Sequence, residues 1–142
     1  MVCLLLLFAA NPLGAGSRGD DKEAPLAQGI LNQVETAARK AKTLEELGKE
    51  TLSQSAEILD LGEAAQKPLL EALKDRKKDW KLRFWVVDIL GYVGDGASEG
   101  ALLKAARNSK ENKLVRGRAK KALREVRERI SASKSRPSRP SQ

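Results

Sequence analysis

The chain has 142 residues, contains no histidine and has a single cysteine, Cys3. This composition excludes a histidine base, a Cys–His nucleophilic pair and a zinc site of the usual Cys/His type. Ala, Leu, Lys, Arg and Glu dominate and only 4% of residues are aromatic, so the composition favours an all-helical domain over a sheet.

The net charge of +8 is unevenly distributed along the chain. Residues 1–100 hold 13 Lys/Arg and 16 Asp/Glu, a net charge of −3, whereas residues 101–142 hold 14 Lys/Arg and 3 Asp/Glu, a net charge of +11. A basic C-terminal part indicates an acidic partner such as nucleic acid, anionic lipid, a polyanionic glycan or an acidic protein. A solvated surface that keeps the protein soluble explains the same charge equally well.

The first 16 residues have the pattern of a secretory signal peptide. Val2 to Ala10 is an unbroken apolar run, and Asn11-Pro12 and the small residues at positions 14–17 follow it, although no Lys or Arg precedes it. The run is too short to span a bilayer, which needs about 20 apolar residues. We therefore expect residues 1–16 to be removed on export, to the periplasm or outside the cell, leaving no transmembrane segment in the mature chain. A cytoplasmic protein with an apolar N-terminus is the alternative.

Polar segments flank the remaining chain on both sides. Residues 17–25 read as a flexible spacer. Residues 131–142 are rich in Ser, Pro, Lys and Arg and have no apolar anchor, so we expect a disordered basic tail. The folded domain is therefore predicted to cover residues 26–130.

The first two predicted helices lie between residues 26 and 62. The first begins near Leu26, and its apolar residues recur at helical spacing: Ala27, Ile30, Leu31, Val34, Ala38 and Ala41. The second begins at a capping box, in which the Thr43 hydroxyl accepts from the Glu46 amide and the Glu46 carboxylate from the Thr43 amide. It is expected to end at Gly62 and to bury Leu44, Leu47, Leu52, Ile58 and Leu59.

The third and fourth predicted helices cover residues 63–74 and 80–93. Pro68 lies in the first turn of the third helix, where a missing amide costs little. The apolar stripe of the fourth helix is Leu82, Trp85, Val86, Ile89, Leu90 and Val93. Because Phe84 and Val87 add apolar surface outside this stripe, we expect this helix to be covered on more than one side.

The fifth and sixth predicted helices cover residues 98–107 and 113–130. The fifth is expected to bury Leu102, Leu103 and Ala106. The sixth is expected to bury Val115, Ala119, Ala122, Leu123, Val126 and Ile130.

Helices three to six form two similar helix pairs, 33 residues apart. The segment Leu82–Leu90 aligns with Val115–Leu123, and a period of this length is typical of solenoids. From Gly62 to Gly91 the chain resembles the HEAT-repeat family, on the motif Pro-Leu-Leu-x-x-Leu-x-Asp followed by a Leu-Arg helix that ends in Leu-Gly. The resemblance implies an all-α fold, a short right-handed α-solenoid of about three antiparallel helix pairs.

The function that the resemblance implies is binding rather than catalysis. HEAT-like repeats commonly serve as scaffolds or adaptors for a protein or peptide partner, although the motif specifies a fold better than a function. Related repeats also occur in phycobilin lyases and some DNA glycosylases, which are distant alternatives. The sequence shows neither a catalytic carboxylate pair nor a phosphate-binding loop. We therefore predict no enzymatic activity, no cofactor, no metal and no small-molecule substrate.

Three groups of residues are candidates for particular roles. Basic residues lie within one stripe of roughly 80° on the last helix: Lys113, Arg116, Lys120, Arg124 and Arg127. With the tail, this basic stripe is the candidate site for an anionic partner, and the solvated face of an edge helix is the alternative.

The equivalent residues Arg83 and Arg116 are expected from the resemblance to make contacts between repeats, with Asp75 or Asp79 as the partner of Arg83. Among the aromatic residues, Trp80 is the candidate exposed contact, whereas Trp85 and Tyr92 are expected to pack in the interior.

Overall fold

The structure, a computed structural model, describes residues 20–136 and is all-helical in that range, with 84% helix and no strand. The predicted all-α class is confirmed. The predicted leader, residues 1–16, and the end of the tail, residues 137–142, lie outside the described residues. Within the described range, no helix combines the length and apolar character needed to cross a bilayer.

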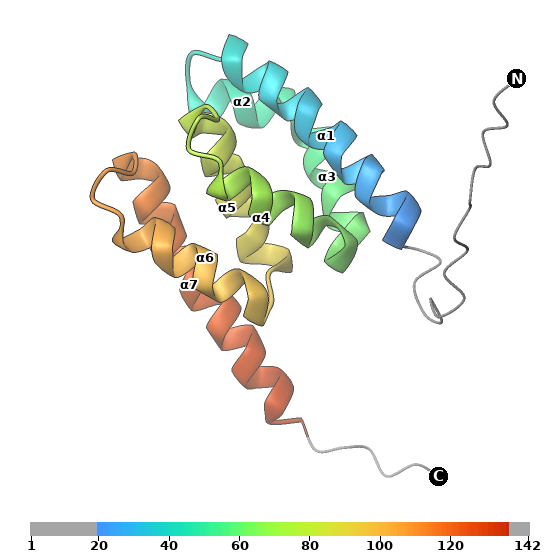
Figure 1. Cartoon of the computed structure of the whole chain (residues 1–142), viewed down its shortest axis with the longest axis vertical. Helices are drawn as coiled ribbons and strands as arrows, with labels where there is room; N and C mark the ends of the chain where they lie inside the picture. The colour runs from blue at the N-terminus through green and yellow to red at the C-terminus, as the bar shows by residue number, and fades with distance from the viewer. Residues whose placement is uncertain (1–19, 137–142) are drawn as a thin grey trace, which may run out of the picture.

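The helices follow one another from one end of the molecule to the other (Figure 1). Their bounds are α1 Asp20–Lys40, α2 Leu44–Glu50, α3 Leu52–Leu61, the short 3-10 helix η1 Gly62–Ala65, α4 Gln66–Lys74, α5 Trp80–Val93, α6 Gly96–Arg107 and α7 Lys113–Lys134. Helix α4 packs against α5, and α6 against α7. Between these pairs, α5 lies along α7 and α4 faces α6, whereas α1 contacts both α3 and α4.

Three helices extend beyond their predicted ends, and one of them, α6, begins at Gly96 rather than at residue 98. Helix α1 begins at Asp20, so residues 20–25 of the predicted spacer are helical, with Pro25 inside the helix. Glu23 lies near the start of α1, where the positive end of the helix dipole stabilises an acidic side chain. Helix α7 continues to Lys134, and the hydroxyl of Ser133 donates to the Ile130 carbonyl. The first part of the predicted tail is therefore ordered as helix.

The predicted second helix is divided at Thr51, whose buried hydroxyl donates to the Leu47 carbonyl at 2.7 Å. In α3, Ile58 is buried, but Leu52 is 70% and Leu59 is 36% exposed, so the predicted inward face is wrong at both leucines. The helix ends at Gly62, as predicted, and this glycine has a positive φ of 55° that favours a residue without a side chain.

The capping box at the start of α2 is confirmed in one half. The Thr43 hydroxyl accepts from the Glu46 amide at 3.1 Å, as predicted. The Glu46 carboxylate accepts from the Lys42 amide at 2.7 Å, rather than from the amide of Thr43. Glu46 therefore reaches one residue further back and still satisfies an amide just before the helix.

Helix α5 is the centre of the core and has the bounds that the sequence predicts. It contacts α1, α3, α4 and α7, which confirms that it is covered on more than one side. Trp85 is only 5% exposed, and its indole Nε1–H donates to the Ser55 hydroxyl on α3 at 3.0 Å. Tyr92, in contrast, is 60% exposed, so its predicted packing in the interior is wrong.

The turns before α5 and α7 repeat each other in hydrogen bonding, 33 residues apart. Asp75 accepts from the Lys77 amide at 3.0 Å, and Asn108 accepts from the Lys110 amide at 3.0 Å. Four residues further on, Asp79 and Asn112 cap their helices through equivalent bonds, each of 2.8 Å. The internal repeat of the sequence is therefore also a repeat of local geometry.

Candidate functional site

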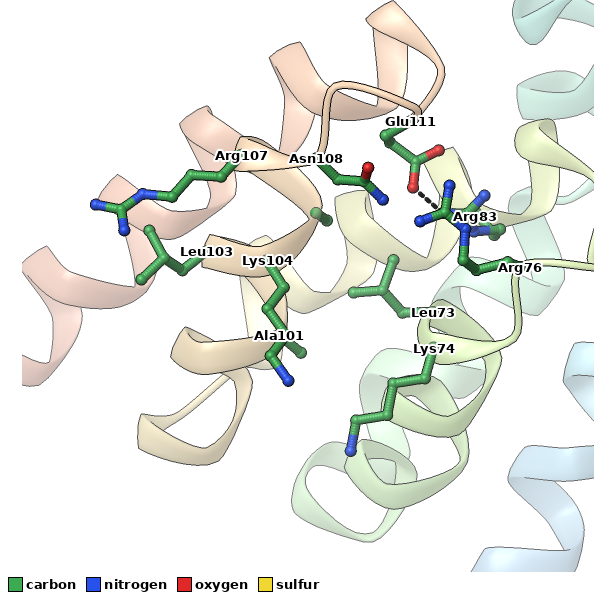
Figure 2. Close-up of a pocket in the computed structure, with 11 residues that line it drawn as sticks. Leu73, Lys74, Arg76, Arg83, Ala101, Leu103, Lys104, Arg107, Asn108 and Glu111 are labelled. Carbon is green, nitrogen blue, oxygen red and sulfur yellow. Dashed lines mark ion pairs between the residues drawn. The ribbon is translucent and has the colours of Figure 1, made fainter.

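An open groove of about 630 Å³ lies between α4 and α6, and we call it the α4/α6 groove (Figure 2). Its apolar lining comes from Leu73 at the end of α4 and from Ala101, Leu103 and Ala105 on α6. The volume is in the range of pockets that hold small molecules or several side chains, roughly 300–1,000 Å³. The groove exists because α4 and α6 each use their other apolar side chains to pack on α5 and α7.

The polar lining of the α4/α6 groove is strongly basic. Four exposed cations line it: Lys74, Arg76, Lys104 and Arg107. Within residues 20–136, none of the four forms an ion pair. Figure 2 shows Lys74 and Lys104 extending from the two helices toward the same end of the groove, whereas Arg107 points away from it. Positive charge therefore surrounds an apolar surface.

One end of the groove holds a buried ion pair between Arg83 on α5 and Glu111 in the turn before α7 (Figure 2). The side chains are 8% and 2% exposed, and the Nε–H of Arg83 is buried without an acceptor among the described residues. Burial lowers the pKa of Arg83, the positive charge of Arg76 lowers it further, and Asp75 raises it. Arg83 stays protonated at neutral pH.

The predicted partner of Arg83 was wrong in identity, although its role between helix pairs was right. The carboxylates of Asp75 and Asp79 instead accept from amides in their own turn. Glu111 is 28 positions away in sequence and reaches Arg83 because the turn between α6 and α7 lies beside α5 (Figure 2). The 33-residue repeat could have indicated this partner. In a stack of repeated helix pairs, the turn within one pair, here between α6 and α7, lies next to the preceding pair, here α4/α5.

The basic stripe lies on α7, outside the α4/α6 groove. Lys113, Lys120 and Arg124 are exposed, and Arg116 is partly buried. Within residues 20–136 the Arg116 side chain forms no ion pair, so the contact predicted for it by analogy with Arg83 is not found. Arg127 pairs with Glu99 of α6 at 2.7 Å. The stripe is therefore partly neutralised by a neighbouring helix, which the spacing along α7 alone did not reveal.

Two further arginines of α7 have structural contacts that the sequence analysis missed. Arg118 binds Asp88 of α5 at 2.6 Å and Glu125 at 3.2 Å. Arg129 donates to the carbonyls of Gly91, Tyr92 and Gly94 at the end of α5. A helix end leaves carbonyls without partners, and a nearby basic residue commonly satisfies them. Both arginines join α7 to α5 and are not free to bind a ligand.

Trp80 is partly buried and packs against the core, with the Lys81 ammonium 5.9 Å from its ring centroid. The exposed aromatic of α5 is Tyr92 instead.

Within residues 20–136, no group of three His, Cys, Asp or Glu side chains is arranged to hold a metal ion. In comparisons with known proteins, no family model, no curated protein and no solved structure matches the chain.

Proposed function

We propose that this protein is a non-enzymatic adaptor that binds a protein or peptide partner in the α4/α6 groove. The observation that carries the proposal is an apolar groove lined by four exposed cations without ion pairs among the described residues. Apolar surface supplies binding energy, and charges around it supply orientation and selectivity.

The proposal includes a short right-handed solenoid of the HEAT type. Two observations support the repeat: α4/α5 and α6/α7 are similar antiparallel pairs, and their turns have equivalent hydrogen bonds. Arg83 also reaches Glu111 in the turn of the next pair, which is a contact between adjacent repeats. Helices α1 and α3 supply the first, less regular pair. In repeat arrays, grooves between successive pairs are common binding surfaces.

Selection from a random peptide display library tests the groove. We expect enriched peptides that bind the full chain and the Ala132→Trp variant but not the Ala101→Trp variant. Ala101 is partly exposed and lines the groove, so an indole there fills the space that a ligand needs. Ala132 is an exposed alanine of α7 that does not line the groove, so the same substitution there is the matched control.

Both variants should retain the helical circular dichroism and the melting temperature of the wild type. If the enriched peptides bound the Ala101→Trp variant as tightly as the wild type, the peptide-binding site would not be the α4/α6 groove. A library that yields no binder at all would contradict a peptide-binding function.

The second candidate function is binding of nucleic acid or another polyanion by the basic stripe, favoured by three exposed cations, Lys113, Lys120 and Arg124, without ion pairs among the described residues. The internal repeat offers a structural reason for the position of the stripe. Arg124 is the repeat equivalent of Gly91, 33 positions earlier, and Gly91 packs directly against α7. The stripe thus occupies the face that would contact a further pair, and a charged terminal face keeps a repeat array soluble.

Salt dependence distinguishes these two interpretations of the stripe. If the stripe binds phosphates, changing Lys113, Lys120 and Arg124 to Gln should flatten the plot of log affinity for duplex DNA against log salt by about 0.9 per lost contact. The control changes Lys40, Lys42 and Lys67 to Gln, which removes equal charge from α1, from the turn after it and from α4. If the two triple variants gave equal slopes of log affinity against log salt, the basic stripe would not bind phosphates and would be only a solvated end face.

We propose that the protein acts after export, because of the signal-like N-terminal sequence. Mass spectrometry of the protein from its native host should find a new N-terminus near Gly16 or Ser17. An intact Met1 with a reduced Cys3 would contradict export. It would favour a location in the cytoplasm, where nucleic acid is an accessible partner.

A further inference from the structure

We propose that the α4/α6 groove recognises an acidic peptide segment, with carboxylates bound by Arg76 and Lys104 and an aliphatic side chain packed on Leu73 and Ala101. This inference rests on the proposed function and specifies the chemistry of the partner. The occupant is a segment of another protein that contains Asp or Glu beside Leu, Ile or Val.

Charge at the groove selects an anionic occupant. Glu111 is the single carboxylate in its lining, and Arg83 already holds it. The four exposed cations form no ion pair within residues 20–136. This excess of positive charge favours a ligand with carboxylates and disfavours a basic ligand.

The buried end of the groove favours a carboxylate in particular. Figure 2 shows the Arg76 side chain extending toward the Arg83 guanidinium, which Glu111 holds on one side. Arg83 is more than nine-tenths buried, and its Nε–H has no acceptor in the described structure. A buried donor without an acceptor is costly and unusual. Because Arg83 Nε lies below the surface, a carboxylate in the groove pairs instead with the exposed guanidinium of Arg76, whose planar geometry it matches.

The apolar lining favours a peptide over a nucleic acid. Among residues 20–136, no aromatic side chain lines the groove, so this part of the chain offers no surface there on which unpaired bases stack. Leu73, Ala101, Leu103 and Ala105 instead provide an aliphatic surface, which suits a branched apolar side chain. Carboxylates next to an aliphatic residue satisfy both parts of the lining.

Fluorescence polarisation with defined peptides tests the inference. The probe is a short, end-blocked peptide that alternates pairs of Glu and Leu, and its two controls replace Glu by Gln or Leu by Ser. We expect binding of the probe alone, weakened at high salt. Arg76→Glu and Lys104→Glu should each reduce the affinity by about fivefold or more, because each turns an attraction into a repulsion.

Lys67→Glu is the matched control, since it makes the same charge change on an exposed residue of α4 outside the groove, and it should leave the affinity unchanged. The inference would be overturned if the Gln peptide bound as tightly as the Glu/Leu probe. It would also be overturned if Lys67→Glu reduced the affinity as much as Arg76→Glu and Lys104→Glu do. Library peptides that require Ala101 but lack acidic residues would overturn it while the proposed function stands. If a single-stranded oligonucleotide bound more tightly than the Glu/Leu peptide, and Arg76→Glu abolished that binding, the ligand of the groove would be nucleic acid instead of a peptide.

Discussion

Replacement of Glu111 by Gln should lower the free energy of unfolding by about 3 kcal/mol or more, the largest loss that we expect from a single polar substitution. The Glu111 side chain is 2% exposed and its partner Arg83 is 8% exposed. Removal of the carboxylate charge leaves a buried guanidinium without its counter-ion, and Arg83 already has one unsatisfied donor. Urea denaturation followed by circular dichroism measures the loss.

The double variant Arg83→Met, Glu111→Leu is the control for this prediction. Because it removes both charges and keeps apolar volume, we expect it to be more stable than Glu111→Gln, although it contains two substitutions. If Glu111→Gln lost less than about 1 kcal/mol, the ion pair would be too well solvated to link the two helix pairs.

Replacement of Trp85 by Ala should lower the free energy of unfolding by about 3–5 kcal/mol, because it leaves a large cavity in the centre of the core. Trp85 is 5% exposed and lies on α5, which contacts four other helices. Trp85→Phe should cost less, since it keeps most of the apolar volume but loses the hydrogen bond to Ser55, worth about 1 kcal/mol. Trp80 remains as a fluorescent reporter in both variants. A loss below about 1 kcal/mol for Trp85→Ala would mean that this face of α5 is not the core.

Local sequence signals predicted much of the fold. The bounds of α5, the Thr43 cap and the helix end at Gly62 all follow from signals within a few residues. The break at Thr51 was missed because a threonine inside an amphipathic pattern does not reveal whether its hydroxyl will bind the preceding turn. Tyr92 was misplaced because it is seven residues after the buried Trp85, and periodicity does not show how far a neighbouring helix extends.

The candidate site was much less predictable. The α4/α6 groove joins Leu73 and Arg76 to Ala101 and Lys104, residues about 30 positions apart, and no local pattern contains them together. The basic stripe, in contrast, is visible in one helix, and this made it the leading candidate. Its contact with Glu99 comes from another helix and required the tertiary structure. Periodicity predicts which residues face inward, but a surface groove depends on which two helices become neighbours.

The central claim is that a peptide ligand occupies the α4/α6 groove, and an NMR titration of the isotope-labelled full chain tests it most directly. Addition of the tightest peptide from the display library should shift the backbone amides around Lys74, Arg76, Lys104 and Ala105, with saturation at one peptide per chain. Amides of α1 and the exposed face of α7 should not move. Saturable shifts confined to α7 or α3, with the groove amides unchanged, would contradict the claim.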